Sequence, residues 1–171
     1  DLFSVFLKID ANQGHYQLLE TIYGELLNKG VGVQVFEVRR DSKKINPIAF
    51  IMGLEQPEFT QCDYDEFLSA FSVSPSEEGM YVFSDTQYLG LLQKFNNEEL
   101  ITNFYETISN ISQVQIILFA IELLNRPAYF IALWPGKELP KDQWEDNFIH
   151  LLKHQLTSSI ENSYLFDLLL R

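Results

Sequence analysis

The sequence predicts an α+β fold, in which an antiparallel or mixed sheet carries helices packed mainly on one face. Short apolar segments occur in pairs joined by tight polar turns, which is typical of antiparallel hairpins. Segments with apolar residues at helical spacing lie between and after these pairs. With 171 residues, of which 46% are hydrophobic, the chain can bury one sizeable core. We therefore expect a single domain over residues 1–171.

The first half of the chain is expected to begin with a strand and a helix. Residues 2–9 alternate so that one face of a strand would be wholly apolar. That face holds Phe3, Val5, Leu7 and Ile9. Asp10 or Asn12 then caps a helix that ends before Gly30. Its apolar stripe consists of Leu18, Leu19, Ile22, Tyr23, Leu26 and Leu27.

A hairpin is expected next. Residues 31–38 and 47–52 are apolar and rich in β-branched side chains, and they flank a polar loop. This loop holds a basic cluster, which we interpret as a solvated turn, with binding to an acidic partner or to lipid head groups as the alternative. The cluster consists of Arg39, Arg40, Lys43 and Lys44, with Asp41 inside it.

Residues 63–95 are expected to form a short helix, a turn, a strand over 80–83 and a longer helix. Three carboxylates open the short helix, where the positive end of the helix dipole stabilises their negative charge. They are Asp63, Asp65 and Glu66. Ser84 or Asp85 is the expected cap of the longer helix.

The rest of the chain is expected to form a helix, a second hairpin and a final helical region. Asn97 is placed to start the helix. Residues 114–124 are almost continuously apolar, which indicates a strand covered on both faces, and 128–134 is its hairpin partner. From Trp144 as far as Leu170, apolar residues recur at helical spacing.

An internal duplication is one interpretation of this order. Residues 46–51 and 126–131 share proline, phenylalanine and isoleucine at the same spacing, and each opens the second strand of an expected hairpin. The halves 1–78 and 79–171 also share the order β-α-β-β-α. The alternative is that two unrelated strands each follow a proline, which suits the first residue of a strand.

The acidity of the chain is regional. Residues 45–125 contain twelve carboxylates and one basic side chain, Lys94, so they carry −11 of the total charge of −12. Such a field attracts basic partners and repels polyanions. It therefore disfavours binding of nucleic acid, which needs cationic contacts to phosphates.

No catalytic, cofactor-binding or metal-binding residue is predicted. The eight glycines form no phosphate-binding loop. His150 and His154 stand one helical turn apart, but Leu151 replaces the glutamate of the zincin pattern, which favours two solvent-facing histidines. Carboxylates beside Cys62 raise the pKa of its thiol, which favours an unreactive cysteine.

Two surfaces are predicted to bind a partner protein. The first is acidic, because helix capping explains where the carboxylates of 45–125 lie but not the scarcity of cations among them. The second is the segment 160–170, which is too apolar for one stripe of a helix; it either docks into its own core or presents a patch to another chain. The predicted partner-binding residues are Asp63, Asp65, Glu66, Glu77, Glu78, Glu98, Glu99, Ile160, Tyr164, Phe166 and Leu169.

A cytoplasmic protein without a membrane span is expected. The single cysteine cannot form an internal disulfide, so a reducing compartment is the simplest interpretation, although a secreted protein without disulfides fits the composition equally well. No apolar run reaches the roughly 18–20 residues that cross a bilayer. The sequence begins at Asp1 rather than at a methionine, so upstream residues stay an open alternative.

In composition and outline the chain is similar to bacterial secretion chaperones and adaptors, and equally to acidic immunity proteins that neutralise basic toxins. The first hypothesis is a non-enzymatic adaptor or chaperone whose partner is another protein with a basic or apolar binding surface. The second is an inhibitor or immunity protein that blocks a basic partner. The third is an enzyme with a carboxylate-lined pocket that no motif marks.

Overall fold

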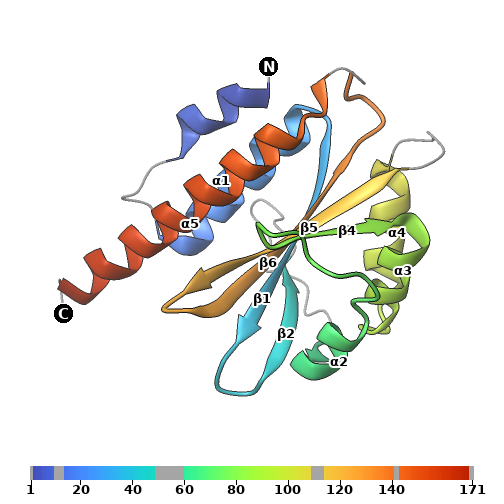
Figure 1. The fold of residues 1–171 in the computed structure, drawn as a ribbon, viewed down its shortest axis with the longest axis horizontal. Coiled ribbons are helices and arrows are strands. Elements are labelled where there is room, and N and C mark those ends of the chain that lie inside the picture. The colour runs from blue at the N-terminus through green and yellow to red at the C-terminus, as the bar shows by residue number, and fades with distance from the viewer. Residues whose placement is uncertain (1, 10–13, 49–59, 109–113, 141–142, 170–171) are drawn as a thin grey trace.

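The computed structural model describes residues 2–9, 14–48, 60–108, 114–140 and 143–169. Within these ranges, six strands form one antiparallel sheet in the order β3-β2-β1-β6-β5-β4 (Figure 1). The strands are β1 (Val31–Arg39), β2 (Lys44–Ile48), β3 (Cys62–Asp63), β4 (Met80–Ser84), β5 (Gln115–Leu123) and β6 (Arg126–Pro135). The helices are the 3-10 helix η1 (Leu2–Lys8) and the α-helices α1 (His15–Asn28), α2 (Tyr64–Ser69), α3 (Asp85–Gln93), α4 (Glu98–Thr107) and α5 (Asp146–Leu169). The predicted α+β class with an antiparallel sheet is confirmed.

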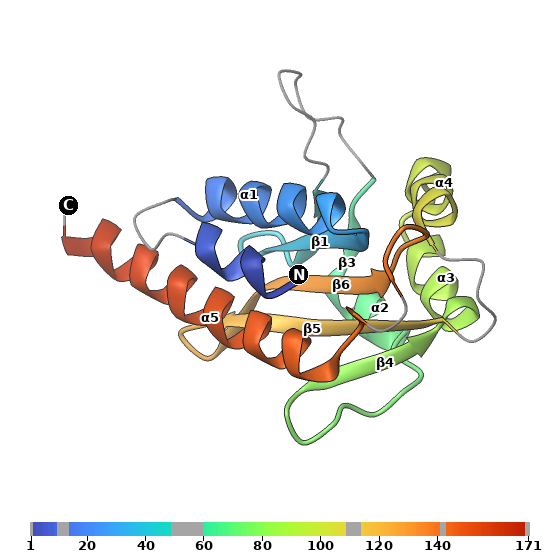
Figure 2. The same ribbon diagram turned by 90° about the horizontal axis from the view of Figure 1, so that it is seen from above.

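Helices cover both faces of this sheet (Figures 1 and 2). The two longest, α1 and α5, pack with η1 on one face. The shorter helices α2, α3 and α4 pack on the opposite face. Both faces need cover because the central strands bury successive residues, so neither face is polar.

The face covered by the shorter helices has an aromatic core. The ring of Phe67 in α2 lies 5.3 Å from that of Phe36 and 5.0 Å from that of Phe130, measured between centroids. Beside this cluster, Trp134 packs against Tyr88 and Phe104 at 5.6 and 5.0 Å. Offset and edge-on pairs of this kind add to the stabilisation that burial provides.

Both predicted hairpins are confirmed. Strands β1 and β2 pair with Arg39 opposite Lys44, and strands β5 and β6 pair with Leu123 opposite Arg126. The second turn consists of two residues with positive φ, Leu124 and Asn125. This is the backbone that a tight antiparallel hairpin favours. The predicted extension of the second strand over 49–52 lies outside the described residues.

The expected strand over 2–9 is wrong, because the segment forms the helix η1. Leu2 and Val5, three residues apart, point into the core, whereas Leu7 of the expected apolar face is 84% exposed. A segment this short satisfies a helical period as well as an alternating one. The first half therefore opens with a helix and the second with β4, and the duplication of 1–78 in 79–171 stays a prediction.

The helix ends follow their predicted chemistry where the chain is described. The hydroxyl of Ser84 accepts from the amide of Gln87, whose side chain accepts from the amide of Ser84, which is a capping box. The side chain of Asn97 caps α4 by accepting from the amide of Glu99. Gly30 ends α1 with a φ of +88°. The expected caps Asp10 and Asn12 lie outside the described residues, and Gly14 occupies the N-cap position of α1.

The final helical region is one continuous helix. In α5, 24 residues run from Asp146 to Leu169 without a break. No helix in the described part of the chain is long and apolar enough to cross a membrane.

Gly32 is a steric requirement of the aromatic core. A Cβ atom at this position would lie 1.9 Å from the indole nitrogen of Trp134. We expect Gly32→Ala to lower the free energy of unfolding by about 1–3 kcal/mol, the usual cost of overpacking a core. Urea unfolding followed by circular dichroism measures this. Gly24→Ala is the matched control, because a Cβ there meets nothing within 4 Å and alanine favours the helix. Equal midpoints for Gly32→Ala and the wild type would contradict the steric argument.

Tyr88 holds a buried hydroxyl without a hydrogen-bond partner among the described residues. Burial also raises the pKa of this phenol well above its usual value. An unsatisfied buried polar group costs about 1–3 kcal/mol, so we expect Tyr88→Phe to raise the free energy of unfolding by about 1 kcal/mol. The same substitution at Tyr105, which is 55% exposed, should leave it unchanged. Chemical denaturation of the two variants measures both effects, and a destabilised Tyr88→Phe would show that the hydroxyl is satisfied.

Candidate functional site

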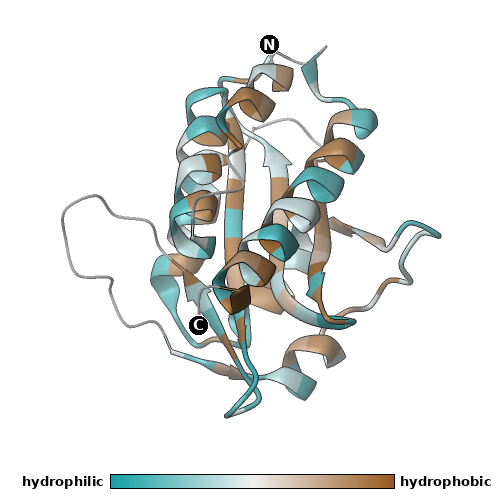
Figure 3. Ribbon diagram, turned by 90° about the vertical axis from the view of Figure 1, so that its left-hand side faces the viewer, coloured by the Kyte–Doolittle hydropathy of each residue, from teal (hydrophilic) through white to brown (hydrophobic). Residues whose placement is uncertain are grey.

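The C-terminal end of α5 presents apolar side chains to solvent. The helix is buried at intervals from Phe148 to Ser163, and beyond that point it extends past the strands (Figures 1 and 2). Its last turns are apolar in Figure 3, where they lie in front of the sheet. The exposed fractions are 53% for Leu165, 50% for Phe166, 47% for Leu168 and 84% for Leu169. We call these four residues the apolar end of α5.

The residues predicted to bind a partner on α5 fall into two groups. Ile160 is 0% exposed and lies in the core with α1 and β5, so it belongs to the part of the helix that docks into its own domain. Tyr164 is half-buried. Phe166 and Leu169 belong to the apolar end. Docking into its own core therefore describes the helix around Ile160, and an apolar patch open to another chain describes the turns that hold Phe166 and Leu169.

The predicted acidic residues lie at three separate places. Asp63, Asp65 and Glu66 are at β3 and the start of α2, and Glu98 and Glu99 are in the first turn of α4. Glu77 and Glu78 lie in the turn before β4. All seven are exposed, but β3 and β4 form opposite edges of the sheet. The structure therefore does not bring the two edge groups together.

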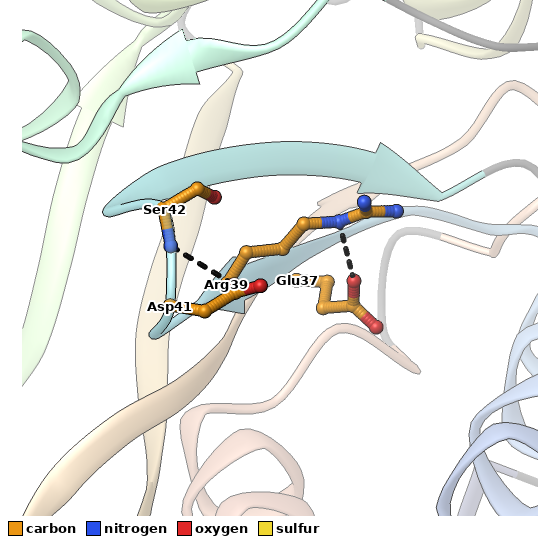
Figure 4. A network of polar contacts seen from close by, with 4 residues as sticks. All are labelled: Glu37, Arg39, Asp41 and Ser42. Carbon is orange, nitrogen blue, oxygen red and sulfur yellow. Dashed lines mark hydrogen bonds and ion pairs between the residues drawn. The ribbon is translucent and has the colours of Figure 1, made fainter.

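Cations of the β1–β2 hairpin contact groups within the domain. Arg39 donates to Glu37 at 3.2 Å, and Asp41 accepts from the amide of Ser42 in the turn (Figure 4). Arg40 donates to the carbonyl oxygen of Leu123 at 2.8 Å, which ties this hairpin to the β5–β6 turn. Lys44 pairs with Asp63 across β2 and β3, and this hydrogen bond raises the pKa of Lys44. The hairpin thus uses much of its positive charge internally.

A second candidate surface is a groove between the edge strand β4 and the first half of α5. It encloses about 430 Å³ and has an apolar floor with an acidic rim. Its lining residues are Ser76, Glu77, Glu78, Met80, Val82, Gln115, Ile117, Asp146, Ile149 and His150. We call this the acidic groove.

Glu78 fixes the turn beside the acidic groove to α5. Its carboxylate pairs with Nδ1 of His150, and its carbonyl oxygen accepts from Lys153 at 2.5 Å. Glu78 is therefore held to α5 through both its carboxylate and its carbonyl oxygen. Glu77 and Asp146 have no ion-pair partner among the described residues.

The side chains considered for nucleophilic and metal chemistry have ordinary surroundings. Cys62 is 2% exposed, and burial, followed by Glu66 and Asp63, raises the pKa of its thiol. This direction agrees with an unreactive cysteine. His154 is exposed, and no group of three or more potential metal ligands occurs in the described ranges.

Sequence reasoning missed Val82, Asp146 and His150 as neighbours in one groove. Val82 is far from Asp146 and His150 in the sequence, and it meets them only because β4 is the edge strand nearest to α5. The acidic pair Glu77 and Glu78 was the one signal that pointed to this place.

Comparison with proteins of known structure finds a similar fold. It is similar to residues 122 to 287 of a methyl-accepting chemotaxis protein, with a TM-score of 0.54, 13% sequence identity and 96% of each chain covered. A GAF domain from an Acinetobacter phosphoenolpyruvate-protein phosphotransferase gives a TM-score of 0.48 at 8% identity, covering 96% of this chain and 92% of the other. No family model and no curated protein matches the sequence. At 13% identity, the likeness to the chemotaxis protein shows a shared fold.

Proposed function

We propose that this domain is a non-enzymatic protein-binding domain, an adaptor or chaperone-like subunit, that binds its partner through the apolar end of α5. The observation that supports this most directly is the exposure of four large apolar side chains within five consecutive residues of one helix. Contiguous apolar surface of this kind marks interaction sites in soluble proteins.

The arrangement suits a helix that inserts into a groove of another protein. Leu165, Leu168 and Leu169 stand at positions i, i+3 and i+4, the spacing by which an amphipathic helix anchors in such a groove. Covering apolar surface contributes roughly 25 cal/mol per Å² removed from water. Because this end lies beyond the buried turns, it can be covered without rearranging the core.

Charge around the apolar end indicates the kind of partner. Asp167 is exposed within the apolar end, Glu161 is exposed one turn before it, and α5 has no basic residue in its last turn. A partner groove with an apolar floor and a basic rim would match these side chains. This partner is the protein with a basic or apolar surface that the sequence predicts.

The double substitution Leu165→Ser/Leu169→Ser tests the proposal. We expect the wild-type domain to capture a partner from extracts of its source in a stoichiometric complex, and the double variant to lose that partner at least tenfold. Thermal unfolding should be nearly unchanged, because both side chains are exposed. The binding loss follows from removing the apolar anchors.

Leu151→Ser is the matched control, since Leu151 is 44% exposed on the same helix but outside the apolar end. It should retain the partner. Capture that survives in the double variant would overturn the proposal. A purified wild type that sediments as a dimer, together with a double variant that sediments as a monomer, would also overturn it, because a second copy would then cover the apolar end.

A further inference from the structure

The outer edge of β4 is closed at both ends and open in the middle. The amide of Met80 donates to the hydroxyl of Ser76 at 3.1 Å, and its carbonyl oxygen accepts from the amide of Ser76 at 2.8 Å. At the other end, the amide of Ser84 donates to Gln87 at 2.8 Å. In an antiparallel strand, both backbone groups of a residue point to one side, and successive residues alternate. Val82 therefore directs its amide and carbonyl outward, away from β5.

Apolar side chains beside Val82 form the floor of the acidic groove. Val82 is 41% exposed, which is unusual for a β-branched residue in the sheet of this protein. Met80, Ile117 and Ile149 lie next to it and are 5%, 5% and 1% exposed. The floor thus offers one exposed apolar side chain together with one open pair of backbone groups.

The rim of the acidic groove carries uncompensated negative charge. Glu77, before β4, and Asp146, in the first turn of α5, both line the groove. Both are exposed and without an ion-pair partner in the described ranges, whereas Glu78 is held by His150 and Lys153. A cation bound in the groove would be attracted by both carboxylates.

We propose that the acidic groove binds a short extended protein segment in which an apolar and a basic residue stand two positions apart. The backbone of the segment pairs with Val82, and its apolar side chain covers Val82 and the floor. The side chain two residues further along, a lysine or arginine on the same face of the added strand, lies toward Glu77 and Asp146. This is addition of a strand to a sheet edge, with side-chain pockets setting the specificity.

Closure of the edge at Met80 and Ser84 limits how much backbone hydrogen bonds can contribute to the affinity for the segment. With one residue available for pairing, the segment gains few ladder hydrogen bonds, so side chains and charge decide the affinity. A second copy of this chain is a poor occupant, because pairing β4 with β4 would bring Glu77 and Asp146 of each copy toward carboxylates of the other.

A peptide titration tests the proposal without knowledge of the natural partner. The probe is a fluorescein-labelled hexapeptide with the sequence serine-lysine-serine-valine-serine-lysine, which places valine and lysine on one face of a strand, and its counterpart has glutamate in place of both lysines. We expect fluorescence anisotropy to show binding of the lysine peptide that weakens as salt rises, and no binding of the glutamate peptide. The amide signal of Val82 should shift in NMR spectra, because its hydrogen atom gains an acceptor.

Two double variants separate the groove from the overall charge. Glu77→Gln/Asp146→Asn should raise the dissociation constant at least tenfold. Glu98→Gln/Glu99→Gln removes the same charge from α4 and should change it less than twofold. Equal effects of the two variants, or equal binding of both peptides, would overturn the proposal. The apolar end of α5 plays no part here, so Leu165→Ser/Leu169→Ser should bind the peptide as the wild type does.

Discussion

Burial of the central strands on both faces is the constraint on which the rest of the structure depends. In β5, Ile116, Ile117, Leu118 and Phe119 are all buried, so successive side chains enter opposite cores. A sheet of this kind exposes two apolar faces and needs helices on each. One face is covered by α1 and α5, and the other by α2, α3 and α4.

This constraint decides where surfaces remain for binding. Helices occupy both faces of the sheet, so partners can reach its edges and the parts of helices that run past it. The 24 residues of α5 span about 36 Å at 1.5 Å per residue, whereas the nine residues of β5 span about 30 Å. The excess length, together with the oblique course of α5, leaves its apolar end beyond the strands (Figure 2).

Local chemistry made much of the fold predictable, and chain topology made the rest unpredictable. Ser84 and Asn97 mark helix starts because their hydrogen bonds join neighbours in sequence. Residues 2–9 misled because so short a segment fits two periodicities. The helix packs on residues that are distant in sequence, and Phe3 and Phe6 contact Phe148 of α5. That contact joins opposite ends of the chain, so no local pattern contains it. The acidic groove depends in the same way on which strand lies at the edge.

The acidic residues at β3 and those beside β4 lie at opposite edges of the sheet, which limits how far they can act together on one partner. From β3 to β4 the sheet has five inter-strand spacings, or about 24 Å at roughly 4.8 Å each. The Debye length is about 8 Å at physiological ionic strength, so charges at Asp63 and Glu77 act almost independently on a bound partner. The twelve carboxylates of 45–125 can therefore steer an approaching cation collectively at low salt, but specificity must come from one place. Glu77 and Asp146 line a groove that also has an apolar floor and an open strand edge, and that combination distinguishes the acidic groove from the carboxylates that start α2 and α4.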